Sequence, residues 1–201
     1  GIHLHTDLII GLPGEDISSF ASGFDQLLSL GVEEIQVGIL KRLRGAPIAR
    51  HTKEWEIVYH PEPPYEILQN ASLSFADLAE LRRFARYWNI IGNSGRFPFS
   101  LQEFKKQDSA FFSFLDFSQW LYQKTGRTHK ISYNNLLQYL RDYWIEKGLD
   151  AEEIISILSK DYTHTTGKEN RPRFLNITQE EGRESKAKMQ LPKRQRMHSQ
   201  D

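Results

Sequence analysis

The sequence contains no cysteine among its 201 residues. Without a thiolate it can form no disulfide, no thiolate zinc site and no cysteine nucleophile, and it supplies no ligand to an iron–sulfur cluster. The net charge is also zero, because 26 Lys and Arg residues balance 26 Asp and Glu residues. No global electrostatic attraction therefore favours nucleic acid or a membrane surface as a partner.

Long apolar runs are also missing. No run reaches the roughly eighteen apolar residues that a spanning helix needs, and the first residues lack the basic and apolar regions of a signal peptide. We therefore expect a cytoplasmic protein with no membrane partner. The hydrophobic share of 39% and the aromatic share of 12% are sufficient for a packed core in one or two domains.

The most informative segment that is present is DLIIGLPGED, residues 7–16. Its apolar start is typical of a strand that is buried on both faces, as in a parallel sheet. Gly11 and Gly14 permit a tight turn and a close approach of the backbone to a ligand, and Pro13 stiffens that turn. Glu15 falls at a helix start, where an acidic side chain complements the helix dipole. The carboxyl ends of parallel strands are where α/β enzymes place their cofactors.

The residues that follow complete one βαβ unit. Apolar residues at spacings of three and four predict a helix over residues 17–30, and the run IQVGIL predicts a second strand over residues 35–40. Two parallel strands alone cannot bury both faces or pair both edges. We therefore expect this sequence, which begins at Gly1, to be the end of a larger sheet whose earlier strands precede it. The alternative is a small self-contained α+β domain in which the downstream helices cover the pair.

Beyond residue 50 the pattern becomes mainly helical. A short strand is expected within Trp55–Tyr59. Four longer segments show helical spacing and suitable caps, at residues 74–88, 109–125, 132–147 and 151–162. Their aromatic residues repeat at the spacing typical of a helical core. The expected fold class is therefore α/β followed by mainly α.

This pattern divides the sequence into three parts. Residues 1–50 hold the βαβ unit, and residues 51–162 form a helical C-terminal domain. Residues 163–201 are polar and carry an excess of Lys and Arg, so we expect a mobile tail that docks only through Phe174–Leu175.

The pairing of DLIIGLPGED with IQVGILKRLRGAPI resembles the last part of the radical SAM barrel. The similarity is to the subgroup in which a cobalamin-binding domain precedes that barrel. The stretches PPYEIL, NSGRF and LPKRQRMH resemble the uncharacterised helical domain that follows the barrel in this subgroup. The resemblance implies that residues 1–50 form the terminal βαβ unit of a partial (β/α) TIM-like barrel, and that the chain is the C-terminal part of a radical SAM enzyme.

The resemblance also implies roles for particular residues. In this family the glycine-rich turn and the Ile before it lie near the adenine of S-adenosylmethionine, which here marks Ile9, Gly11, Pro13, Gly14 and Glu15. A flat apolar base needs close backbone approach and aliphatic contact, so these residue types suit the role. The alternative is a strand–turn–helix corner in which the glycines serve geometry alone.

Lys41 leaves the second strand at the end where a ligand would lie. Its ammonium group could pair with a cofactor carboxylate or phosphate. A basic residue at a strand end is equally often only solvated.

The sequence departs from the family in one decisive respect. The family depends on a C-x-x-x-C-x-x-C motif that holds a [4Fe–4S] cluster, and no such motif is present here. We therefore expect the cluster, most of the S-adenosylmethionine site and a cobalamin-binding segment to lie in a preceding part of the same protein. The chain alone should be inactive, and its substrate and catalytic residues are unknown.

Three other hypotheses stay open. His3 and His5 lie on one side of a strand, as the metal-binding H-x-H of amidohydrolase barrels does, which would make a metal-dependent hydrolase. The helices of residues 74–162 could instead form a non-catalytic interaction module. Finally, the basic stretch at residues 193–196 is the one plausible nucleic-acid contact, but a solvated terminus is the better explanation and nucleic acid is not an expected partner.

Overall fold

The computed structural model describes residues 4–166 and 172–175. The chain divides into two compact units, a first unit of residues 1–132 and a second unit of residues 133–201. The expected domain boundaries after residues 50 and 162 stay predictions. Within the described ranges, no helix is both long and apolar enough to cross a membrane.

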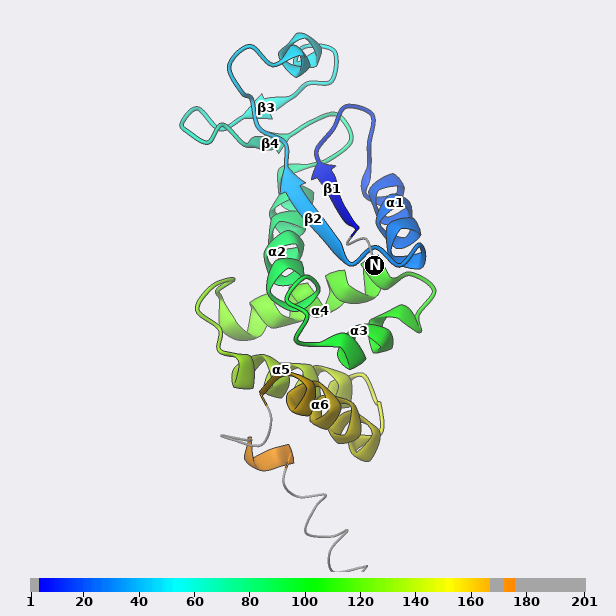
Figure 1. Cartoon of the computed structure of the whole chain (residues 1–201). Coiled ribbons are helices and arrows are strands. Elements are labelled where there is room, and N and C mark those ends of the chain that lie inside the picture. The colour runs from blue at the N-terminus through cyan, green and yellow to red at the C-terminus, as the bar shows by residue number, and fades with distance from the viewer. Residues whose placement is uncertain (1–3, 167–171, 176–201) are drawn as a thin grey trace, which may run out of the picture. The chain divides into compact units, whose positions relative to one another are not determined.

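The first unit begins with the expected βαβ unit (Figure 1). Strand β1 (His5–Ile10) is followed by helix α1 (Ile17–Ser29) and strand β2 (Glu34–Ile39), and the two strands pair in parallel. Asp16 starts α1, because its side chain accepts a hydrogen bond from the backbone N–H of Ser19. The acidic and glycine signals of the sequence thus produce the strand–turn–helix corner that they predict.

A small hairpin follows the 3₁₀ helix η1 (Pro47–His51) and contacts the end of β2. It consists of β3 (Val58–Tyr59) and β4 (Ile67–Gln69), which pair antiparallel. The hairpin joins β2 through an antiparallel bridge between Lys41 and Glu66. The expected strand within Trp55–Tyr59 is confirmed only in its last two residues, and β4 was not predicted.

Three helices complete the first unit, α2 (Phe75–Ile91), α3 (Pro98–Lys105) and α4 (Ala110–Thr125). Their core is aromatic: the rings of Phe84 and Phe111 lie 4.6 Å apart, and Phe24 of α1 lies 4.8 Å from Trp88. The interpretation of the aromatic stripe as core is confirmed here. Helix α3 was not predicted, and α2 continues three residues beyond the predicted end at Trp88.

The second unit contains α5 (Tyr133–Glu146), α6 (Ala151–Thr166) and the 3₁₀ helix η2 (Arg173–Leu175). Apolar residues of α5 and α6 are fully buried, and so is Leu175. The guanidinium of Arg141 lies 4.6 Å from the ring centre of Phe174. Phe174 and Leu175 thus make the predicted contact, while α6 includes residues 163–166, which were predicted to belong to the tail. The mobility of the tail stays a prediction, and the basic residues 193–196 lie outside the described residues.

The fold is thus mixed α/β and mainly helical. That coarse class agrees with the prediction. The partial (β/α) TIM-like barrel stays a prediction.

Candidate functional site

One face of the β1–β2 pair is packed and the other is open. Ile10 and Ile35, on the packed face, are completely or almost completely buried. On the opposite face the side chains of His5 and Asp7 are 41% and 67% exposed, and Ile9 is 42% exposed. Side chains alternate between the faces of a strand, so this contrast follows the period of two. The sheet therefore presents a polar and aliphatic strip that the described residues leave uncovered.

The outer edge of β1 is also free. Glu34 and Leu40 of the β2 segment donate backbone hydrogen bonds to Leu4 and Ile10, at 3.3 and 2.9 Å. Alternate residues of a parallel strand bond to the same neighbour. The backbone groups of residues 5, 7 and 9 therefore point to the other edge of β1, where the described part of the chain supplies no strand.

The glycine turn after β1 is packed against the hairpin. A Cβ on Gly11, whose φ is +98°, would lie 2.9 Å from the Cγ2 atom of Ile67. The side chain of Asn70 donates a hydrogen bond of 3.2 Å to the carbonyl oxygen of Gly11. A Cβ on Gly14 would lie 3.2 Å from the indole of Trp55. Close packing within the chain thus explains why both positions are glycine. Their predicted contact with a cofactor stays a prediction.

Glu15, directly after Gly14, is half-buried at this turn. Burial, together with the charge of Asp16, raises the pKa of the Glu15 carboxyl above its ordinary value. Its Oε2 atom is buried and has no hydrogen-bond partner among the described residues. A carboxyl oxygen in that state can bind a donor from a ligand or a neighbouring segment. Pro13 is half-buried in the same turn.

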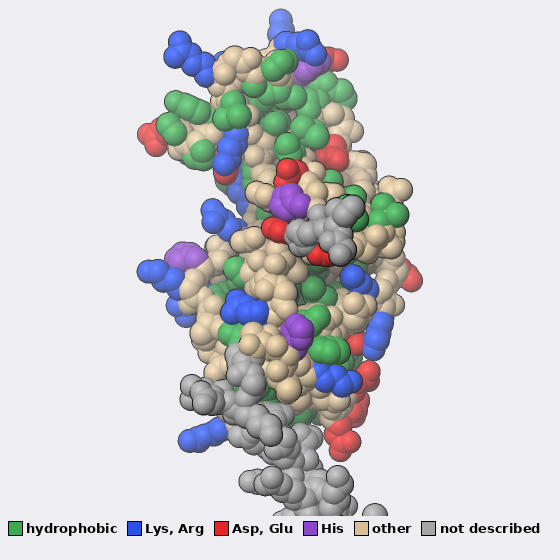
Figure 2. All heavy atoms as spheres, viewed as in Figure 1, with side chains coloured by type: hydrophobic (Ala, Val, Ile, Leu, Met, Phe, Trp, Pro, Cys, Tyr) green, Lys and Arg blue, Asp and Glu red, His purple; other side chains and the backbone are tan. Residues whose placement is uncertain are grey.

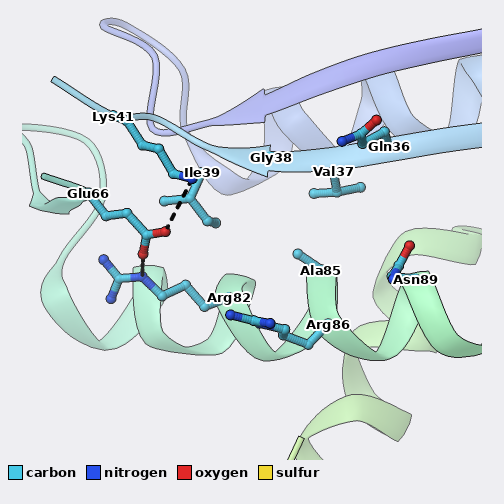
Figure 3. A pocket seen from close by; sticks show the side chains of 10 residues that line it. All are labelled: Gln36, Val37, Gly38, Ile39, Lys41, Glu66, Arg82, Ala85, Arg86 and Asn89. Atoms are coloured by element: carbon cyan, nitrogen blue, oxygen red, sulfur yellow. Dashed lines mark ion pairs between the residues drawn. The ribbon is translucent and has the colours of Figure 1, made fainter. Parts of the chain in front are cut away.

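Lys41 lies apart from these residues. Its Nζ atom is 3.9 Å from Oε1 of Glu66, and Oε2 of Glu66 is 3.4 Å from Nε of Arg82 (Figure 3). Together the three side chains line one end of a pocket of about 340 Å³ between β2 and α2. None of the five marked residues of β1 and its turn lines this pocket. The structure therefore groups Lys41 with α2, and its role toward a cofactor remains untested.

His5 is held by carboxylates. Its Nδ1 lies 3.2 Å from Glu34 and its Nε2 lies 3.4 Å from Asp7. The hydrogen bond to Glu34, then the charges of Glu34 and Asp7, raise the pKa of the His5 imidazole. His3, the other half of the H-x-H hypothesis, lies outside the described residues. Among residues 4–166 and 172–175, no three His, Asp or Glu side chains gather in a way that could hold a metal ion.

The sequence interpretation missed most of the pocket. Arg82, Arg86 and Asn89 repeat at helical spacing along α2 and line it. Such a polar stripe is typical of a solvated helix face, so the sequence gives no signal that marks these residues. Only the placement of α2 beside the edge of β2 shows that this stripe faces another element.

Comparison with known proteins identifies the helical part. Residues 53–200 match a family described as a protein of unknown function, DUF4080, and the chain belongs to this family. The match begins after the βαβ unit, so β1 and β2 lie outside it. No curated protein matches the chain.

Proposed function

We propose that this chain supplies the last two strands of a radical SAM-type partial (β/α) barrel, followed by a helical DUF4080 domain. The observation that supports this most directly is the parallel β1–β2 pair, in which the described residues leave one face exposed and the outer edge of β1 without a neighbouring strand. An exposed strand edge is a template for another strand, so further strands would complete the sheet. A barrel interior would then lie over His5, Asp7 and Ile9.

Exposed apolar side chains support the same proposal. Ile9, Leu12 and Leu43 are among the large hydrophobic residues that stay exposed near the two strands and their ends. Figure 2 shows hydrophobic side chains gathered on the surface of this part of the first unit. Contiguous apolar surface of this kind marks a contact with another segment or a ligand.

Within that barrel the chain would contribute one side of the S-adenosylmethionine site. Ile9 offers an aliphatic surface on the open face, and Gly11 and Gly14 keep the turn free of side chains. Glu15 offers a carboxyl oxygen that has no partner in the described part of the chain. When bound to its cluster, S-adenosylmethionine supplies the radical chemistry of this class. The residues of this chain would bind and orient it.

The cluster itself does not fit this chain, because none of its residues is a cysteine. Its ligands, and a cobalamin-binding segment, would belong to a preceding part of the same protein. The residues of this chain alone would therefore carry out no catalytic step. The helical domain would act as a cap on the barrel.

The second candidate is a non-catalytic interaction module. The family match supports it, because that match spans residues 53–200 and leaves the βαβ unit out. Under this alternative the helices would form the binding surface, and another partner would pair with the outer edge of β1.

The open reading frame upstream of the codon for Gly1 separates the two candidates. The barrel proposal predicts a C-x-x-x-C-x-x-C motif there, preceded by strands and helices in alternation. A frame that encodes no such motif would eliminate the barrel proposal and leave the interaction module.

A further inference from the structure

The pocket between β2 and α2 lies along a gap in the pairing of the second strand. At one end of the gap, the side chain of Asn93 binds the backbone N–H and C=O groups of Ile35. At the other end, the backbone N–H of Ile67 donates to the carbonyl oxygen of Leu40 at 2.9 Å. Asn93 thus closes the outer edge of β2 before residues 37–39, and after them the chain enters the bridge between Lys41 and Glu66.

The backbone groups in the gap face the pocket. Residues 34 and 40 direct their N–H groups toward β1, and Ile35 directs its groups toward Asn93 on the opposite side. By the same alternation Val37 and Ile39 point away from β1. Both residues line the pocket. Their N–H and C=O groups therefore form a short open edge with donors and acceptors in alternation.

The side chains around this edge are cationic at one end and amidic at the other (Figure 3). Lys41 and Arg82 share the single carboxylate of Glu66. Arg86 has no hydrogen bond or ion pair within the described part of the chain, although it lines the same pocket.

The amide side chains lie at the opposite end of the pocket. Gln36 and Asn89 are likewise unpartnered among the described residues, and both are exposed. Ala85 lies between the two ends and, being small, leaves the pocket open.

We propose that this pocket binds a small peptide-like carboxylate, such as the end of an acylated dipeptide. The carboxylate would pair with Arg86, whose planar fork suits two parallel hydrogen bonds. A peptide unit of the ligand would pair with the open edge at Val37 and Ile39, as an added strand does. The gap is about 7 Å long at the rise of a strand residue, which is the length of about two residues.

The chemistry of the lining favours this ligand over a phosphate or a nucleotide. The dianion of a phosphate ester offers acceptors only and would leave the carbonyl groups of the edge unpaired. The residues that line the pocket include no aromatic ring on which a base could stack. A volume of about 340 Å³ suits a ligand of this small size. This inference does not depend on the barrel proposal.

The test is an NMR titration of the complete 201-residue chain labelled with ¹⁵N. The probe is N-acetylglycylglycine, and its C-terminal amide and inorganic phosphate are titrated separately. We expect saturable shifts of the backbone amides of Val37 and Ile39. The amide analogue should bind about tenfold more weakly, because it lacks the charge that Arg86 would bind. Phosphate binding that equals that of the dipeptide, or shifts that avoid this edge, would overturn the proposal.

Variants make the test specific. R86Q should weaken the dipeptide about tenfold, whereas R127Q, which removes the same charge from an exposed residue outside the pocket, should leave the affinity unchanged. A85L fills the pocket without removing a charge and should abolish the shifts. Both pocket residues lie at the surface of α2, so the spectra of the free variants should show a folded chain. Equal weakening by R86Q and R127Q, or full binding by A85L, would contradict the assignment.

Discussion

The side-chain amide of Asn93 hydrogen-bonds to both backbone groups of Ile35, accepting from the N–H at 3.2 Å and donating to the C=O at 3.0 Å. The indole N–H of Trp88 also donates to that carbonyl, at 3.1 Å. Two side chains thus take the place of a neighbouring strand at the outer edge of β2. This closes part of the β2 edge from within the chain, while the edge of β1 stays open. The asymmetry is what a last strand requires.

The first prediction concerns this contact. Asn93→Ala removes both hydrogen bonds and leaves the N–H of Ile35 without a partner, so we expect a loss of about 1–3 kcal/mol in the free energy of unfolding. Urea denaturation of the first unit's transition measures it. Asn89→Ala is the matched control, because Asn89 is exposed and has no partner among the described residues. A loss for Asn93→Ala no larger than that of the control would contradict the assigned role.

The second prediction concerns the glycine turn. Gly11→Ala must adopt a φ of +98° and also place its Cβ against Ile67, so we expect a loss of about 2–4 kcal/mol in stability. Gly31→Ala has a φ of +74° and no atom within 4 Å, so it should lose only about 1 kcal/mol. Chemical denaturation of both variants compares them. Similar losses would show that packing against Ile67 does not constrain the turn.

The third prediction concerns pH. The carboxylates of Glu34 and Asp7 raise the pKa of His5 in the folded chain. The contact therefore stabilises the fold below the ordinary His pKa of about 6.5, and this contribution disappears as the pH rises through the folded pKa. An NMR titration of the His5 ring should show the raised pKa, and Glu34→Gln should bring it down. An unchanged pKa in Glu34→Gln would rule out Glu34 as the main cause.

The fourth prediction follows from the proposed division of the cofactor site. This chain offers at most one side of it and no cluster ligand, so the 201-residue chain should bind S-adenosylmethionine weakly. Isothermal titration calorimetry measures this directly. Sub-micromolar affinity would mean that the chain holds a complete site, against the proposal.

Much of the fold can be predicted from the sequence, because the signals that specify its first elements are local. The apolar run, the glycine turn and the cap at Asp16 place α1 and β2 within a residue of their observed ends, whereas β1 begins at His5, two residues before the predicted segment. Strand β4 is missed because its three residues are ordered by pairing with β3 and by the hydrogen bond from Ile67 to Leu40, which leave no local signal in the sequence. Helix α3 has only eight residues, beginning with Pro98, which are too few for a clear period.

The candidate site is harder to predict from the sequence, because tertiary contacts define part of it. Residues at the glycine turn follow from a motif, so they can be marked in advance. Arg86 cannot be distinguished in the sequence from any solvated arginine on a helix. Its significance comes from the open part of the β2 edge, which begins after the contact between Asn93 and Ile35.

Amide hydrogen exchange of β1 tests the central claim most directly. In the 201-residue chain we predict alternation, with slow exchange at Leu8 and Ile10 and fast exchange at Asp7 and Ile9, whose N–H groups point to the open edge. In a longer protein that includes the preceding strands, all four amides should exchange slowly. Uniform protection in the 201-residue chain, or persistent alternation in the longer protein, would contradict the claim that β1 accepts a neighbouring strand.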